Sequence, residues 1–85
     1  MIYTIKIDKK ARKQLNSLPI PVQNRIERKI DDLAQNPRPH GVEKLSGEEN
    51  LYRVRIGDYR VIYQILDKIL LVLIVKIGHR REVYR

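Results

Sequence analysis

The residue types best suited to chemistry in this sequence are arginine, histidine and tyrosine, gathered in its C-terminal part. The segment LYRVRIGDYRVIYQIL (51–66) holds three arginines, and the ending GHRREVYR (78–85) adds a histidine, further arginines and a tyrosine. Guanidinium groups bind phosphate oxygens in pairs, and a tyrosine ring offers a surface for base stacking, which favours single strands over duplexes. We therefore predict one basic depression formed by Arg53, Arg55, Arg60, His79, Arg80 and Tyr84, with Arg81 and Arg85 as further RNA-binding residues.

A tight hairpin is expected to bring the first three arginines together. Two alternating runs flank Gly57-Asp58, and a two-residue link that begins with glycine predicts a type II′ turn. The resulting register sets Arg55 opposite Arg60 and leaves these two and Arg53 on the face away from the core. Opposed like charges destabilise a strand pair, so we expect an anion among them; a solvated outer face is the alternative.

The chemistry that these groups allow does not need a metal. The sequence has no cysteine, and neither its acidic residues nor its two histidines show metal-ligand spacing, so no metal or other cofactor is expected. The reaction would then be attack of an RNA 2′-hydroxyl on the neighbouring phosphate, with a proton acceptor and positive charge on the phosphorane. Arginine suits the second role, and His79 is the candidate for the first; the alternative is that His79 is only a turn residue.

Composition agrees with a polyanionic partner. The chain has 85 residues, enough for a single domain (1–85), and carries 18 basic and 10 acidic residues for a net charge of +8. The longest apolar run, 69–75, is far shorter than a membrane span, and no secretion signal opens the chain. We expect a cytoplasmic protein with no membrane association.

The remaining elements form an α+β scaffold in the order β-α-α-β-β-β. A strand (2–7) precedes a helical hairpin whose helices cover residues 9–18 and about 21–35, and a turn-rich connector follows (37–50), with a short element predicted at 42–45. After the hairpin, 69–77 reads as a central strand covered on both faces. We expect the helices on one side of an antiparallel sheet. His40 and the α-helical cations Arg25, Arg28 and Lys29 are interpreted as ordinary surface residues.

Three segments give the sequence a family resemblance. NPRPHGVEKLSG (36–47), LYRVRIGDYRVIYQI (51–65) and GHRREVY (78–84), together with the opening strand and helices, resemble the RelE-type toxins of the RelE/ParE toxin–antitoxin superfamily. The resemblance implies a microbial-RNase-like fold and a metal-free, ribosome-dependent endoribonuclease that cleaves mRNA in the A site. It also implies a cognate RelB-type antitoxin, with which the toxin forms a hetero-oligomer.

The resemblance also implies roles for single residues. Arg60 corresponds to the arginine that stabilises the transition-state phosphate, Arg80 to a second arginine that assists the leaving group, and Tyr84 to the tyrosine that stacks on the target nucleotide. Arg53 and Arg55 stand where the best-known member has two lysines, one implicated as the base. His79 or Glu82 is the proposed substitute.

The sequence also bears on how the protein is inhibited and on two alternative activities. Some relatives carry a C-terminal helix beyond the tyrosine; the sequence stops at Arg85, so direct masking of the site is the expected form of inhibition. One alternative is a ParE-like poison of DNA gyrase, which has no use for a stacking tyrosine beside arginines. Another is a non-catalytic RNA- or ribosome-binding module.

Overall fold

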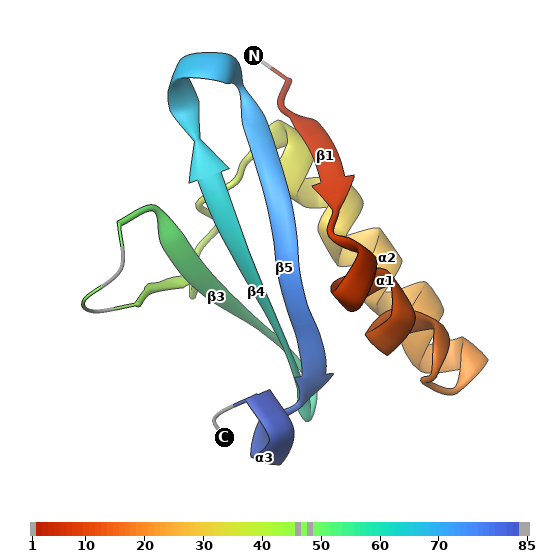
Figure 1. Ribbon diagram of the computed structural model, residues 1–85. Coiled ribbons are helices and arrows are strands. Elements are labelled where there is room, and N and C mark those ends of the chain that lie inside the picture. Colours follow the sequence, from red (N-terminus) through yellow and green to blue (C-terminus); the bar gives the residue numbers. More distant parts are fainter. Residues whose placement is uncertain (1, 46, 48, 84–85) are drawn as a thin grey trace.

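The structure is a computed structural model that describes residues 2–83 except 46 and 48. The side chains of residues 82 and 83 are not described. Both long helices lie against the same face of the sheet (Figure 1). Along the chain the elements are β1 (Thr4–Ile7), α1 (Lys9–Asn16), α2 (Ile20–Gln35), β2 (Glu43–Lys44), β3 (Leu51–Ile56), β4 (Tyr59–Leu66), the 3₁₀ turn η1 (Asp67–Ile69), β5 (Leu71–His79) and α3 (Arg80–Val83).

The α+β class and the helices on one side are confirmed, and the four strands that follow the helices pair antiparallel as expected. Only β1 departs from the expected antiparallel sheet. The five strands lie in the order β1-β5-β4-β3-β2, and β1 pairs with β5 in parallel. The sheet is therefore mixed. Strand direction in such a long-range pair depends on how the helices return the chain to the sheet, and alternation in the sequence carries no information about it.

The strand after the hairpin also differs from expectation. It begins at Leu71, because residues 67–69 form the 3₁₀ turn, and it extends to His79. It lies between β1 and β4, as an interior strand should. Leu71 and Leu73 are only half-buried, however, because α1 and α2 cover just the opposite face.

The β3–β4 hairpin has the predicted register. Arg55 is directly opposite Arg60, and Val54 is opposite Val61. Gly57 has a φ of 59°, whereas Asp58 does not have a positive φ, which distinguishes a type II′ turn from a type I′ turn.

The core side of the hairpin packs against the two helices. Val54, Val61 and Tyr63 are buried there. The other fully or almost fully buried apolar residues come from α1, α2, β4 and β5: Ala11, Leu15, Ile26, Ile30, Leu33, Ile65, Val72, Ile74 and Ile77. This core fixes the hairpin in place and leaves its arginine face on the outside.

The connector between α2 and β2 is fastened to the sheet where it begins. The hydroxyl of buried Tyr63 donates to the carbonyl oxygen of Pro37 at 2.7 Å. The next residue, Arg38, donates from its two terminal nitrogens to the Asp67 carboxylate at 3.2 and 2.8 Å. Because the chain reaches His40 two residues later, these bonds position the part of the connector that borders the site described below.

Replacing Asp67 by asparagine should lower the melting temperature at pH 7, with a difference that disappears in acid. Hydrogen bonds from Arg38 and from the Tyr3 hydroxyl, at 2.6 Å, lower the pKa of Asp67 from its ordinary 3.8 to about 2. A carboxyl group whose pKa falls on folding stabilises the protein above its ordinary pKa, and this contribution is lost as the pH falls through the folded value. Melting curves of both proteins at pH 7, 4 and 2.5 measure the effect.

The control for this prediction is Asp31→Asn, which removes an exposed carboxylate from α2. It should leave the melting temperature close to that of the wild type at all three pH values. A difference between Asp67→Asn and wild type that stays constant from pH 7 to pH 2.5 would show that the Asp67 carboxylate charge does not contribute.

Candidate anion-binding site

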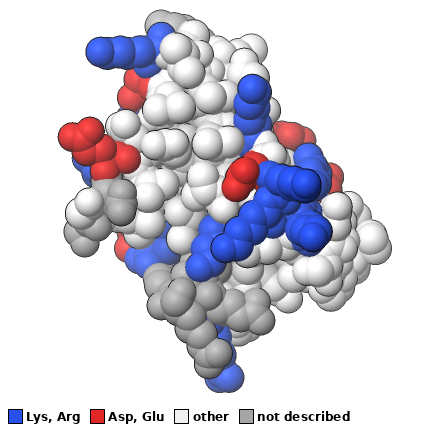
Figure 2. Space-filling view, in the orientation of Figure 1, with Lys and Arg blue, Asp and Glu red and all other residues white. Residues whose placement is uncertain are grey.

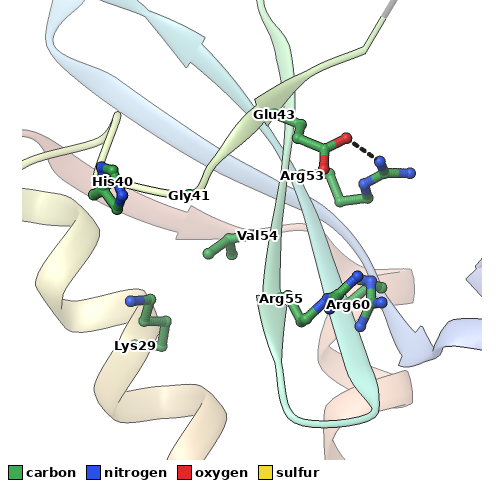
Figure 3. A pocket seen from close by; sticks show the side chains of 8 residues that line it. All are labelled: Lys29, His40, Gly41, Glu43, Arg53, Val54, Arg55 and Arg60. Atoms are coloured by element: carbon green, nitrogen blue, oxygen red, sulfur yellow. Dashed lines mark hydrogen bonds and ion pairs between the residues drawn. The ribbon is translucent and has the colours of Figure 1, made fainter.

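A cavity of about 390 Å³ opens at the outer edge of β3. β2 pairs only with Tyr52 and Arg53, so in the described chain the β3 edge beyond Arg53 has no neighbouring strand. The cavity straddles this open edge, with Lys29 and His40 on one side of β3 and three arginines on the other (Figure 3). Its lining consists of Lys29, His40, Gly41, Glu43, Arg53, Val54, Arg55 and Arg60.

Arg60 is the buried member of the site, with only 5% of its surface exposed. It lies on β4, the middle strand, opposite Arg55 on one side and opposite Gly78, which has no side chain, on the other. One terminal nitrogen donates to the carbonyl oxygens of Tyr59 and Gly57 at 3.1 and 3.3 Å. None of the ion pairs between described residues includes Arg60. A buried guanidinium whose partners among the described residues are carbonyl oxygens is suited to binding an anion, because burial of a charge without a counter-ion is unfavourable.

The other two arginines differ in their surroundings. Arg53 forms an ion pair with Glu43 of β2, whereas Arg55 is exposed and shows no ion pair with a described acidic residue. All three arginines line the same cavity, so their predicted clustering is confirmed. With Lys29 they bring four cations to one carboxylate, a balance that favours an anionic ligand.

The structure does not bring His79 to this cavity. His79 is opposite Tyr59 in the β4–β5 pair, and its ring meets that of Tyr59 edge-on, with centroids 5.7 Å apart. Tyr59 and Arg60 are neighbours in one strand, so their side chains point to opposite faces of the sheet. The expectation that His79 lies among the arginines is therefore not met, because the strand register places it on the helix-covered face.

The tail returns to the hairpin as expected, although it lines no part of this cavity in the described chain. The amide of Arg80 donates to the carbonyl oxygen of Asp58 at 2.9 Å, so α3 begins beside the hairpin turn. Arg81 follows on α3 and is exposed. The predicted site residues Tyr84 and Arg85, and the side chain of Glu82, lie outside the described part of the molecule.

Three lining residues had no assigned role in the sequence: Lys29, His40 and Glu43. They come from α2, the connector and β2, and only tertiary packing brings them to the edge of β3. Nothing in their local sequence distinguishes them from other surface residues. The turn-rich connector was the one available signal, because a long loop in a small domain often borders a site.

Charge is unevenly distributed over the molecule. On the face that Figure 2 shows, Lys and Arg form an oblique band from below the centre to the right-hand side, while the area above this band is mostly uncharged. In the described chain, no three His, Asp or Glu side chains form a group that could hold a metal ion, and no helix has the length and apolar character needed to cross a bilayer.

Comparison with known proteins identifies the family. Residues 5–84 match the family described as ParE toxin of type II toxin-antitoxin system, parDE. The RelE1 protein of Methanocaldococcus jannaschii is 33% identical to the chain, in an alignment that covers all of the chain and 98% of the relative. The chain belongs to the RelE-type toxins of the RelE/ParE superfamily.

Further relatives of this toxin support its assignment to the family. The mRNA interferase toxin RelE of Escherichia coli is 28% identical over 99% of the chain and 92% of the relative. Among solved structures, RelE in the archaeal RelE–RelB complex from Pyrococcus horikoshii is 40% identical and superposes with a TM-score of 0.83, covering 94% of this toxin and 97% of that chain. The predicted RelE fold is thereby confirmed.

Proposed function

We propose that this toxin is an endoribonuclease that cleaves mRNA on the ribosome. The observation that carries the proposal is Arg60, a buried guanidinium without an acidic partner in the described chain, which lines a cavity together with three further cations. The name of the Escherichia coli relative, mRNA interferase, supports the choice of substrate.

In the proposed reaction, the 2′-oxygen of a ribose attacks the adjacent phosphorus atom and the bond to the 5′-oxygen breaks, which leaves a 2′,3′-cyclic phosphate. Arg60 binds the phosphorane oxygens, on which negative charge develops. Arg80, beside the hairpin turn, assists departure of the 5′-oxygen, and Tyr84 stacks on the nucleotide, as the family resemblance implies. Arg53, Arg55, Arg81 and Arg85 bind the phosphate backbone.

Because His79 faces the other side of the sheet, we assign the proton acceptor to Glu43. Its carboxylate lines the cavity and is held there by Arg53. His40 lines the same cavity, and an imidazole is suited to return a proton to the leaving oxygen near neutral pH. Every proton in the reaction then has a donor or acceptor among the residues of the site.

We further propose that a RelB-type antitoxin inhibits the toxin by covering this basic cavity in a toxin–antitoxin complex. The Pyrococcus horikoshii relative was solved as a complex of RelE with RelB. An anionic segment of the antitoxin would satisfy the cations that RNA otherwise binds.

The test of the proposed function uses purified toxin and ribosomes carrying a defined message, with cleavage positions mapped by primer extension. We expect cuts that depend on the ribosome and leave cyclic phosphate ends. Because the matching family is described as ParE, the same preparation is assayed for inhibition of DNA gyrase. Intact message with inhibited gyrase would replace the proposal with gyrase poisoning; ribosome binding without cuts would leave only a non-catalytic binding module.

A further inference from the structure

A second basic hollow adjoins the site cavity and shares two of its residues. It measures about 290 Å³ and lies between α2 and the tip of the β3–β4 hairpin. Lys29 and Arg55 line both hollows, so the two form one continuous basic surface. The complete lining of the second hollow is Arg25, Arg28, Lys29, Asp32, Arg55 and Ile56.

The α2 cations of this hollow are not neutralised within the described chain. Arg28 and Asp32 are four residues apart, a spacing that allows an ion pair on a helix, yet the ion pairs of the described residues involve neither of them. The same holds for Arg25 and Lys29. Their charges remain available to an outside anion.

The hairpin tip and α2 fit closely here. A Cβ atom added to Gly57 would lie only 2.8 Å from a terminal nitrogen of Arg25. The Arg25 guanidinium therefore rests against the turn, next to the strand that carries Arg55. Contact between the turn and α2 therefore places the cations of α2 next to Arg55 of the hairpin.

We propose that this hollow is a second phosphate subsite, which holds the backbone of the same RNA strand away from the cleaved bond. The identity of the ligand as RNA rests on the proposed function. Four of the six lining residues are cationic and one, Ile56, is apolar. The buried core of a protein–protein interface is poor in charged residues, whereas nucleic-acid interfaces are polar and strongly positive. RNA is therefore the occupant that the lining favours over a protein segment.

The experiment measures binding of two non-cleavable RNA probes that carry 2′-O-methyl groups, a trinucleotide and a 12-mer, by fluorescence anisotropy. The trinucleotide is short enough to occupy only the site cavity that Arg60 lines, whereas the 12-mer is long enough to reach both this cavity and the second hollow. We expect Arg25→Ala/Arg28→Ala to weaken 12-mer binding on the order of tenfold at low salt and to reduce the salt slope by about 1.4, the value for two lost single-strand phosphate contacts. Trinucleotide affinity should stay within about twofold of wild type, because neither residue lines the first cavity.

The matched control is Lys10→Ala/Lys13→Ala, which removes the same charge from exposed positions on α1 that line neither hollow. It should bind both probes nearly as wild type does. An equal loss of RNA affinity in the two double variants, or an equal loss for both probes, would show that net charge and not a defined site attracts the RNA. Either result would overturn the subsite. Unchanged 12-mer binding in Arg25→Ala/Arg28→Ala would also overturn it. Polyglutamate is the third probe, and loss of polyglutamate binding with unchanged 12-mer binding in this variant would assign the hollow to an acidic protein.

Failure of this subsite and failure of the proposed function give different results. The binding measurements need no cleavage, so a toxin that shows the expected probe-length dependence but leaves ribosome-bound message intact would keep the subsite and lose the endoribonuclease activity. Normal cleavage of ribosome-bound message, together with identical effects of Arg25→Ala/Arg28→Ala on both probes, would keep the endoribonuclease activity and exclude the subsite.

Discussion

Arg60→Met is expected to reduce single-turnover cleavage by about 10²–10³-fold, the usual effect of removing one group that stabilises a developing oxyanion. The substitution should not destabilise the fold in proportion. Arg60 is 5% exposed and has only two carbonyl oxygens as described partners, with Arg55 directly across the strand pair. Burial of a charge without a counter-ion is unfavourable, and an apolar side chain of similar length removes that burden.

We therefore expect cleavage and stability to change in opposite directions. The melting temperature of Arg60→Met should equal or exceed that of wild type, and each kcal/mol gained would raise it by about 4–8 °C in a domain of this size. Arg12→Met, at an exposed position of α1, is the matched control and should change neither quantity appreciably. A melting temperature lowered by many degrees, with cleavage lost to the same extent as folded protein, would mean that Arg60 serves the fold.

Glu43→Gln is the second substitution with a large expected effect. It should lower single-turnover cleavage by about 10²–10⁴-fold, the range for loss of a general base. The amide keeps the size of the carboxylate and can still accept a hydrogen bond from Arg53, but it cannot take the proton from a 2′-hydroxyl. Binding of a non-cleavable RNA should become tighter, because a negative charge is removed from the cavity.

This combination of tighter binding and slower cleavage separates a base from a residue that only positions Arg53. A positioning residue would lose binding and cleavage together. Glu27→Gln removes an equal charge from the exposed surface of α2 and should leave both measurements unchanged. Full cleavage by Glu43→Gln would exclude the assignment, and a large defect in His79→Ala but not in Glu43→Gln would return the role to the histidine.

Local sequence rules predict the hairpin because they act between neighbouring residues. A glycine that adopts a positive φ fixes the two-residue turn, and the turn fixes every pair up to Arg53 and Ile62. Alternation then separates the arginine face from the core face. The clustering of Arg53, Arg55 and Arg60 follows from these two facts alone.

Prediction fails where placement depends on contacts between distant segments. The face on which His79 lies depends on the β4–β5 register, which includes a bulge beside Ile62 and Tyr63 that shifts the pairing. The parallel pairing of β1 with β5 depends on how α1 and α2 return the chain. Neither feature leaves a local pattern in the sequence.

The sequence by itself determined the chemistry available to this toxin, namely clustered guanidinium groups on one face of a tight hairpin with a strong basic excess. Only the tertiary structure decided which groups accompany them. It brought Lys29, His40 and Glu43 to the open edge of β3, and it placed His79 on the opposite face. The physical reason is that backbone geometry and side-chain alternation act between neighbouring residues, whereas the site closes through packing of α2, the connector and β2 against the edge of β3.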